Sequence, residues 1–281
     1  MGRYCDLHTH SHYSDGTLSP AQIIAEAERL SLSAVALTDH NTVAGLPEFL
    51  AAARNTALQA VPGVEISTNY KEKELHILGL FLKPETFGEV TDLLDGFNRK
   101  KEESNRLLIR NLNKAGYTLD YADICRSHRE GTVNRAVIAS ALLERGYVSN
   151  INEAFRGLLS KKSGYYFPPE RLSALEAIAF LRNIHAVPVL AHSFLNLKTE
   201  EELRIFLKQA VPCGLAAMET MYSAYSAETT ETARHIAREF GLAESGGSDF
   251  HGQTKPHISL GTGKGSLAVP ADFTNYLKNT I

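Results

Sequence analysis

Short apolar runs alternate with amphipathic segments along most of the chain. A helix is predicted to begin at Ser19 and Pro20, where a serine cap precedes a proline in the first turn. Further helices are expected over 48–58, 174–185 and 229–240, and after Thr199. Strand-length apolar runs lie at 4–7, 34–37, 60–64, 75–82, 187–192, 215–219 and 242–245. Because strands alternate with helices, we expect a parallel sheet, and the number of units favours a barrel.

The pattern changes near residue 98. The stretch 97–116 is strongly charged and carries a helical apolar stripe, and 132–146 reads as a second helix. Turn-forming Gly and Pro within 161–170 close this region, after which the alternation of strands and helices resumes. We therefore expect a barrel formed by 1–98 and 169–281, interrupted by a helical insertion at 99–168.

Composition limits the classes of protein to which the chain can belong. It has 281 residues, 43% hydrophobic and 22% charged, which is typical of a globular protein. Its 29 basic and 32 acidic residues give a net charge of -3, which argues against a bulk electrostatic grip on duplex DNA. No apolar run reaches membrane-spanning length and no signal-peptide core is present. The three cysteines are widely spaced and odd in number, so a reducing cytoplasm is the expected location.

Candidate metal-binding residues recur where the predicted strands end, and the chain holds 11 histidines. In a barrel of this kind the carboxyl ends of the strands meet at one face, so these residues are expected to converge. His8 and His10 lie on one side of their strand because side chains alternate with a period of two. Histidine mixed with carboxylate suits Zn, Mn or Fe. The candidate donors are His8, His10, Asp15, His40, Glu65, His76, His192, Asp249 and His251.

The carboxylates suggest how such a site could work. Among Asp15, Glu65 and Asp249, Glu65 is the best candidate to bridge two cations. A divalent cation lowers the pKa of a bound water towards about 7, which produces a nucleophile at neutral pH. No GxSxG motif and no cysteine beside a His/Asp pair offers a side-chain nucleophile. Asp6 and Asp39 are expected to orient neighbouring ligands.

Six motifs, in this order, resemble the PHP (polymerase and histidinol phosphatase) family of metal-dependent phosphoesterases. They are DLHTHSHYSDGTLSP, LTDHNTV, PGVEIS, HILGL, AH and GSDFHG. The resemblance covers about 1–98 and 169–265 and is strongest to bacterial 3',5'-nucleoside bisphosphate phosphatases and 5'-3' exoribonucleases. It implies a distorted (β/α)7 barrel of the TIM-like PHP fold, with an insertion that contributes to the substrate site.

The resemblance also implies two or three divalent ions and their ligands. His8, His10, Glu65 and Asp249 would surround the first ion and hold the attacking hydroxide. Glu65, His76 and His192 would hold the second ion, and Asp15, His40 and His251 the third.

Substrate contacts are implied at three further positions. Arg135 and Lys162 match phosphate-contacting positions in the insertion, although both could equally be ordinary surface cations. The sequence departs from the family pattern twice: Ser193 follows His192 where proline is usual, and Tyr225 replaces a histidine that could touch phosphate or sugar. Tyrosine can still hydrogen-bond or stack there, but it carries no charge.

The expected activity is hydrolysis of a phosphate ester in a small phosphorylated nucleotide such as adenosine 3',5'-bisphosphate. The alternatives are a 5'-3' exoribonuclease acting on a short RNA end, a histidinol phosphate phosphatase, and a non-catalytic metal-binding regulatory domain. The partner is expected to be a nucleotide or short RNA rather than a membrane or duplex DNA. Substrate, native metal and oligomeric state are left open.

Overall fold

The computed structural model describes residues 3–127, 133 and 135–280. It contains two compact units. The first unit comprises 1–91 and 172–281, and the second comprises 92–171. The expected insertion at 99–168 includes 128–132 and 134, which lie outside the described residues.

The first unit contains an eight-stranded sheet in the order β7-β6-β5-β4-β3-β2-β1-β8. The strands β1 to β3 run parallel, as do β5 to β7, whereas β4 is antiparallel to both β3 and β5 and β8 is antiparallel to β1. Their bounds are β1 (Tyr4–Asp6), β2 (Ala34–Leu37), β3 (Gln59–Tyr70), β4 (Lys73–Leu80), β5 (Val187–Leu190), β6 (Ala217–Tyr222), β7 (Ala243–Gly247) and β8 (Val269–Pro270).

Backbone hydrogen bonds from the segment that follows β1 to the end of β7 and the residues after it nearly close this sheet into a barrel. Leu7 N donates to Gly246 O at 3.1 Å, Asp249 N to His8 O at 2.9 Å, and His10 N to Phe250 O at 2.9 Å. The closure confirms the predicted α/β barrel, but the sheet has eight strands and is mixed, because β4 and β8 run antiparallel to their neighbours, where seven parallel strands were expected. It also brings two segments that are 240 positions apart in the sequence into one ladder, and both segments carry candidate ligands.

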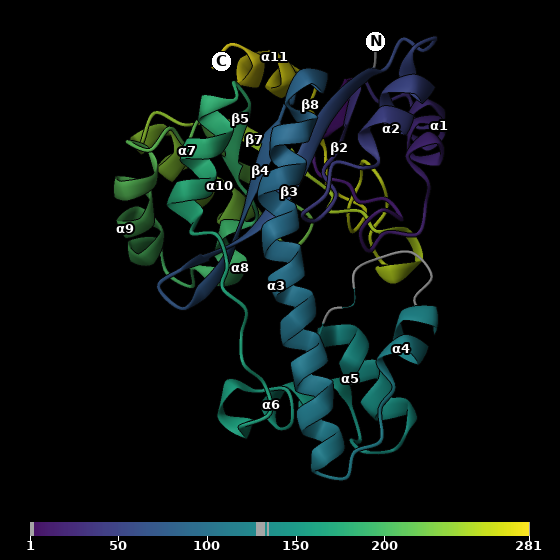
Figure 1. Cartoon of the computed structure of the whole chain (residues 1–281). Helices are drawn as coiled ribbons and strands as arrows, with labels where there is room; N and C mark the ends of the chain where they lie inside the picture. Colours follow the sequence, from purple (N-terminus) through teal and green to yellow (C-terminus); the bar gives the residue numbers. More distant parts are fainter. Residues whose placement is uncertain (1–2, 128–132, 134, 281) are drawn as a thin grey trace. The chain divides into compact units, whose positions relative to one another are not determined.

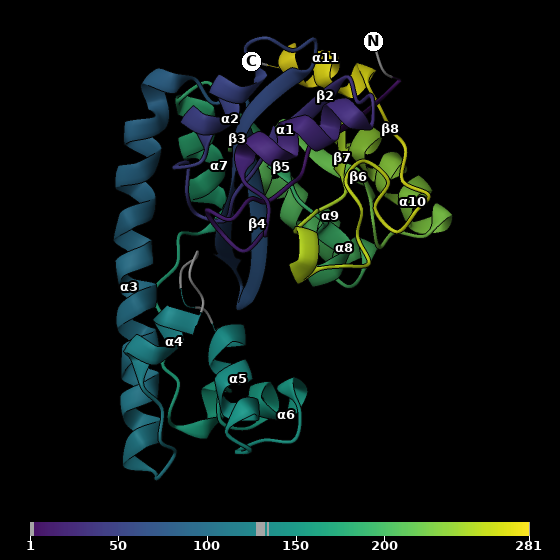
Figure 2. The ribbon, with the colours of Figure 1, turned by 90° about the vertical axis from the view of Figure 1, so that its right-hand side faces the viewer.

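Helices cover the outside of the barrel (Figures 1 and 2). They are α1 (Pro20–Arg29), α2 (Leu46–Ala53), α7 (Ala174–Asn183), α8 (Ser193–Asn196), α9 (Glu200–Ala210), α10 (Ala227–Glu239) and α11 (Asp272–Lys278), with short 3₁₀ turns at Pro84–Thr86 and Gly252–Thr254. The predicted start at Ser19 is confirmed, because its side chain accepts a hydrogen bond from Gln22 N in a capping box. Phe273 and Leu277 of α11 join the apolar core formed by the strands.

The strand β3 is longer than its apolar run predicts. The run stops at Val64 because polar residues follow it, yet the strand continues to Tyr70 and pairs with β4 over its whole second half. A two-residue turn joins the two strands, and both turn residues, Lys71 and Glu72, have positive φ. The hairpin turn therefore forms without the Asn or Gly that usually marks it.

Two helices also begin earlier than predicted. The structure begins α2 at Leu46 because Pro47 fits the first turn, and ends it at Ala53. The charged helix of the insertion, α3 (Phe87–Lys114), begins ten residues before the predicted 97–116, with Val90 and Leu94 buried. Glycines at 88 and 96 obscure this start in the sequence.

The second unit has its own apolar core. It contains the larger part of α3, α4 (Tyr121–Ser127), α5 (Arg135–Glu144), α6 (Ile151–Arg156) and a 3₁₀ turn at Lys161–Ser163. Leu108, Leu112, Leu142 and Leu159 are fully buried within it. Among the residues that the structure describes, no helix is both long and apolar enough to span a bilayer.

Candidate metal centre

The candidate ligands reach one region of the barrel from six strands and the loops that follow them. His8 and His10 follow β1, His40 follows β2, His192 follows β5, and Asp249 and His251 follow β7, while Glu65 and His76 lie within the β3–β4 hairpin. Four overlapping groups have donor atoms within 4.8 Å of one another. They are His10, Asp15, His40 and His251; His8, His10 and Asp249; His8, Glu65 and His192; and His40, Glu65 and His76.

Glu65 lies at the centre of these groups and is completely buried. Both of its carboxylate oxygens face imidazole nitrogens. Oε1 lies 2.7 Å from His76 Nδ1 and 3.0 Å from His192 Nε2. Oε2 lies 3.2 Å from the Nε2 atoms of His8 and His10, and 3.1 Å from His40 Nδ1. The two oxygens therefore serve different sets of histidines, which is the arrangement a bridging carboxylate needs.

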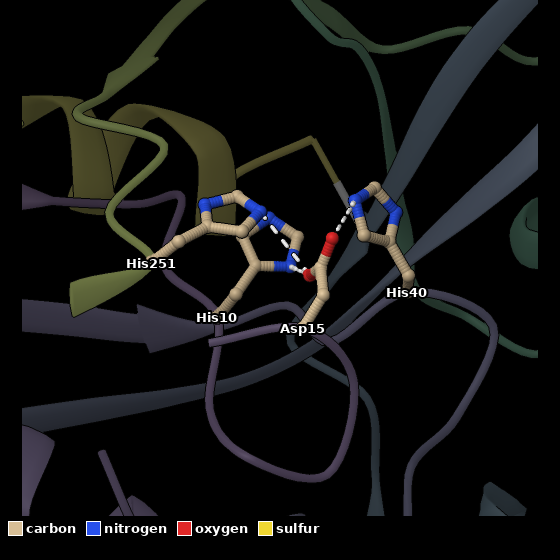
Figure 3. Close-up of side chains that lie close together, drawn as sticks. All are labelled: His10, Asp15, His40 and His251. Atoms are coloured by element: carbon tan, nitrogen blue, oxygen red, sulfur yellow. Dashed lines mark ion pairs between the residues drawn. The ribbon is translucent and has the colours of Figure 1, made fainter. Parts of the chain in front are cut away.

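Asp15 forms a second meeting point at the more open edge of the site, where its side chain is 38% exposed (Figure 3). Oδ1 lies 3.2 Å from His251 Nε2 and 3.9 Å from His10 Nδ1, and Oδ2 lies 3.9 Å from His40 Nε2. The carboxylate thus stands between His40 on one side and His10 and His251 on the other.

Unsatisfied polar atoms are concentrated on these side chains. Among the described residues, every buried side-chain nitrogen or oxygen without a hydrogen-bond partner, except Ser245 Oγ, belongs to a candidate ligand. The atoms are His8 Nε2, His10 Nδ1 and Nε2, Asp15 Oδ1, His40 Nδ1, Glu65 Oε2 and His192 Nδ1. Each unsatisfied buried polar atom costs about 1–3 kcal/mol of folding free energy. The concentration of such atoms at one place therefore requires an explanation. Imidazole and carboxylate donors directed at common points fit divalent transition-metal ions.

The electrostatics of the site favour positive charge. Burial opposes the charged form of each imidazole, but the carboxylates of Asp249 and Glu65 raise the pKa of His10 to about 9. In the same way Glu65 outweighs burial and raises the pKa of His76 to about 10. Burial likewise opposes ionisation of Glu65, yet the surrounding imidazoles hold its pKa well below the usual range. Burial instead prevails at His40, whose pKa it lowers to about 3, and at His251, whose pKa it also lowers, so these two imidazoles are neutral.

Glu219, which the sequence analysis did not single out, positions two of the histidines. It is fully buried on β6. Its Oε1 accepts from His8 Nδ1 at 2.9 Å, and its Oε2 accepts from the backbone N–H of His192 at 2.6 Å. The first contact leaves His8 Nε2 directed at Glu65, as in a carboxylate–histidine–metal arrangement. In the sequence, the only sign of this role is that an acidic residue ends the apolar run 215–219.

Asp249 is held in a comparable way. Tyr222 Oη donates to its Oδ2 at 2.9 Å and Lys255 Nζ donates to the same oxygen at 2.8 Å, so Oδ1 is left facing His8 and His10. Burial, and then the charge of Asp249, raise the pKa of the Tyr222 phenol, which therefore stays protonated and donates. Sequence reasoning missed both supporting residues.

Two candidate ligands have backbone conformations that L-residues seldom adopt. His192 has φ 26° and Asp249 has φ 58°. Such conformations cost roughly 1–3 kcal/mol and persist where surrounding contacts impose them. The bond from His192 N to Glu219 and the bond from Asp249 N to His8 O supply those contacts.

Asp6 and Asp39 act through loops rather than through imidazole rings. Asp39 accepts from Ser11 N at 2.7 Å and from Ser14 Oγ at 2.6 Å, which fixes the loop that carries Asp15. Asp6 accepts from Ser248 N at 2.8 Å, next to Asp249, and from His8 N at 3.3 Å. Both carboxylates orient candidate ligands by holding the backbone beside them.

The expected substrate contacts lie in different units. In the second unit, the Arg135 guanidinium lies over the ring of Tyr166, 4.5 Å from its centroid, and donates to Leu159 O at 3.4 Å. Lys162 is exposed and lines a cavity of about 490 Å³ in the same unit together with Tyr117, Tyr147 and Tyr165. Their roles towards phosphate remain predictions.

Tyr225 lies in the barrel unit. Its hydroxyl accepts from Phe194 N at 3.1 Å and lies 3.4 Å from Ser193 Oγ. The two positions that depart from the PHP motif pattern, Ser193 and Tyr225, therefore contact each other just after His192.

Comparison with known proteins agrees with this geometry. The PHP domain model matches residues 6–165. A 5'-3' exoribonuclease from Haemophilus influenzae is 31% identical over 251 residues, covering 89% of this chain and 91% of that protein. A 3',5'-nucleoside bisphosphate phosphatase from Chromobacterium violaceum is 26% identical over 247 residues, covering 88% and 86%. The crystal structure of a candidate metal-dependent phosphoesterase from Bifidobacterium adolescentis superposes with a TM-score of 0.81 at 26% identity, covering 100% and 97%.

The barrel and its cluster of histidines and carboxylates define a metal-dependent phosphoesterase. The chain belongs to the PHP family, and it is a hydrolase of that family.

Metal loading is predicted to release protons. Without metal, His10 with a pKa of about 9 and His76 with a pKa of about 10 are protonated at pH 7.5. Metals bind neutral imidazole, so binding expels these protons and the apparent affinity rises with pH. Titration calorimetry with Mn²⁺ in two buffers of different ionisation enthalpy should show net release of more than one proton per chain. A control variant, His235→Gln, replaces an exposed histidine on α10 and should release the same number of protons. Equal apparent enthalpies in the two buffers would refute this.

Glu219 is predicted to govern metal affinity. Replacing Glu219 with Ala should weaken metal binding by about ten- to a hundredfold, because His8 and the backbone at His192 lose their common acceptor. Glu219→Gln should not restore affinity, since one amide group cannot accept from both donors through two oxygens. Competition with a chelator measures the affinity, and circular dichroism verifies the fold. A Gln variant that binds metal as tightly as the unaltered protein would contradict the role.

Proposed function

We propose that the chain hydrolyses a phosphate ester in a small phosphorylated nucleotide, using divalent ions held by the nine side chains. The central observation is that buried Glu65 presents its two oxygens to two sets of imidazoles, and that the far nitrogens of two of these rings, His10 Nδ1 and His192 Nδ1, have no hydrogen-bond partner. His8, His10, Glu65 and Asp249 would hold one ion; Glu65, His76 and His192 a second; Asp15, His40 and His251 a third. One of the overlapping groups contains His8, His10 and Asp249, and another contains Asp15, His40 and His251 together with His10. His76 and His192 meet Glu65 in two separate groups.

When bound, such ions supply a Lewis acid for phosphoryl oxygens and a means of ionising water near neutral pH. The chain itself supplies orientation. Glu219 directs His8 Nε2 inward, and Tyr222 and Lys255 turn one oxygen of Asp249 towards His8 and His10. His251 Nδ1 lies 2.8 Å from Asp249 O, a bond that leaves its Nε2 to face Asp15.

Direct attack by water is favoured over a covalent intermediate. Burial, followed by the nearby charge of Asp6, raises the pKa of the Cys5 thiol to about 12, so it is unreactive. Cys125 is exposed in the second unit and Cys213 follows α9, away from the candidate ligands in sequence.

The size of the site supports a small substrate or a strand end. A cavity of about 300 Å³ is lined by five candidate ligands together with Glu74, Leu195, Asn196, Tyr222 and Lys255. That volume is at the lower end for small-molecule sites and accommodates part of a nucleotide. A bisphosphate of the adenosine 3',5' type is therefore our preferred substrate, with Arg135, Lys162 and Tyr225 as proposed substrate contacts.

Trimming of RNA from a 5' end is the second candidate. It is favoured by the 31% identity, over nine-tenths of each chain, to the Haemophilus influenzae protein named a 5'-3' exoribonuclease. Both substrates present phosphate groups one nucleoside apart, so the same metal site could serve either.

A substrate screen tests these proposals. Adenosine 3',5'-bisphosphate, a 5'-phosphorylated oligonucleotide and histidinol phosphate are offered to the Mn²⁺-loaded protein, and phosphate and nucleotide release are measured. We expect hydrolysis of the first or second substrate, abolished by chelator. Glu65→Gln should lower kcat/KM by more than about a hundredfold, because the bridging charge is lost. Full activity in chelator would exclude the metal chemistry, and exclusive hydrolysis of histidinol phosphate would exclude a nucleotide substrate.

A further inference from the structure

The cavity at the metal centre contains one cationic side chain that is not a candidate ligand. Among the described residues that line it, Lys255 is the only lysine or arginine. It follows the 3₁₀ turn Gly252–Thr254, which itself follows β7. Neither the motif set nor the choice of ligands includes it.

Lys255 has donors to spare. Its Nζ lies 2.8 Å from Asp249 Oδ2, and its side chain is 37% exposed. An ammonium group has three N–H donors, and the bond to Asp249 uses one. The structure describes no acceptor for the other two, so they can serve a molecule in the cavity.

The position of Nζ distinguishes it from the metal ligands. Asp249 Oδ1 faces His8 Nε2 and His10 Nε2, at 3.7 Å and 3.3 Å, whereas Lys255 is bonded to the opposite oxygen. An anion on Nζ would therefore lie beside the ion cluster and not on it. Once an ion shares the charge of Asp249, the ammonium is also less neutralised and attracts an anion more strongly.

An acidic residue of the cavity wall that is not a candidate ligand indicates on which side an anion binds. Glu74 also lines the cavity, and its Oε1 lies 3.4 Å from His76 Nε2. A carboxylate there repels an anion, so a second negative group of the substrate is favoured on the Lys255 side.

We propose that Lys255 binds a phosphate group of the substrate adjacent to the one that is hydrolysed. Lysine acts as a point charge without the fork geometry of arginine, so it accepts either a terminal phosphate or a phosphodiester. The inference rests on the proposed function and names a substrate class: phosphate esters with a second phosphate one nucleoside away. Lys255 acts as a specificity residue, and the ions act on the reacting phosphate.

The test compares Lys255→Met, which keeps the apolar stem, with Lys264→Met, an exposed lysine on the same carboxyl-terminal segment. The Mn²⁺-loaded proteins are assayed on adenosine 3',5'-bisphosphate, a 5'-phosphorylated dinucleotide and p-nitrophenyl phosphate, which has a single phosphate. In Lys255→Met we expect kcat/KM to fall by about ten- to a hundredfold on whichever two-phosphate substrate the unaltered protein hydrolyses. The loss should come mainly from a higher KM, because a charged hydrogen bond to the substrate is lost. Loss on the bisphosphate alone, or on the dinucleotide alone, identifies which source of the second phosphate the site serves. Activity on p-nitrophenyl phosphate and metal affinity should fall by less than kcat/KM on the two-phosphate substrate, because Tyr222 still donates to Asp249, and the Lys264→Met control should match the unaltered protein.

Other outcomes would overturn the proposal. Equal losses on one- and two-phosphate substrates would place Lys255 on the reacting phosphate, and a loss of metal affinity large enough to account for the whole loss of kcat/KM would make it only a support for Asp249. Unchanged kinetics would remove it from the site.

A calorimetric binding measurement distinguishes failure of this inference from failure of the proposed function. If neither nucleotide is hydrolysed, binding of adenosine 3',5'-bisphosphate and of adenosine 5'-monophosphate to the metal-loaded protein decides. Tighter binding of the bisphosphate that is lost in Lys255→Met upholds the inference while the proposed function fails. Equal binding of the two nucleotides, or none, refutes the inference.

Discussion

A carboxylate with no exposure to water cannot remain ionised unless cations or donors surround it. Glu65 is such a group, and five imidazoles within 3.2 Å of its oxygens are what keep its pKa low. The rest of the barrel unit can be understood from this requirement. The five imidazoles come from four strands or the loops after them, β1, β2, β4 and β5, and the barrel brings these segments together.

The backbone supplies much of this delivery. The β3–β4 hairpin places Glu65 and His76 on neighbouring strands, and the ladder between the segments after β1 and β7 unites His8, His10 and Asp249. Positive φ at Asp249, and at His192 after β5, is tolerated because hydrogen bonds to those two backbones hold them. The strained backbone at these two residues lowers the stability of the fold locally, and it places their side chains where a metal ion can bind them.

The barrel and the convergence of the candidate ligands could be predicted from the sequence, because period-two alternation and strand-end positions are local signals. It did not reach Glu219, Tyr222 or Lys255. A lone acid in an apolar strand or a lysine in a loop acquires meaning only from its partner, and those partners are 211, 27 and 6 positions away in the sequence. The full extent of β3 was missed for a related reason: its second half is polar and is stabilised by pairing with β4.

The number and place of the ions test the account most directly. Protein purified without chelator and analysed by elemental mass spectrometry, followed by anomalous diffraction from its crystals, reports both. We expect at least two transition-metal ions per chain, with Glu65 in contact with more than one of them. A single ion that Glu65 does not touch, or a chain that is fully active and free of metal, would contradict it.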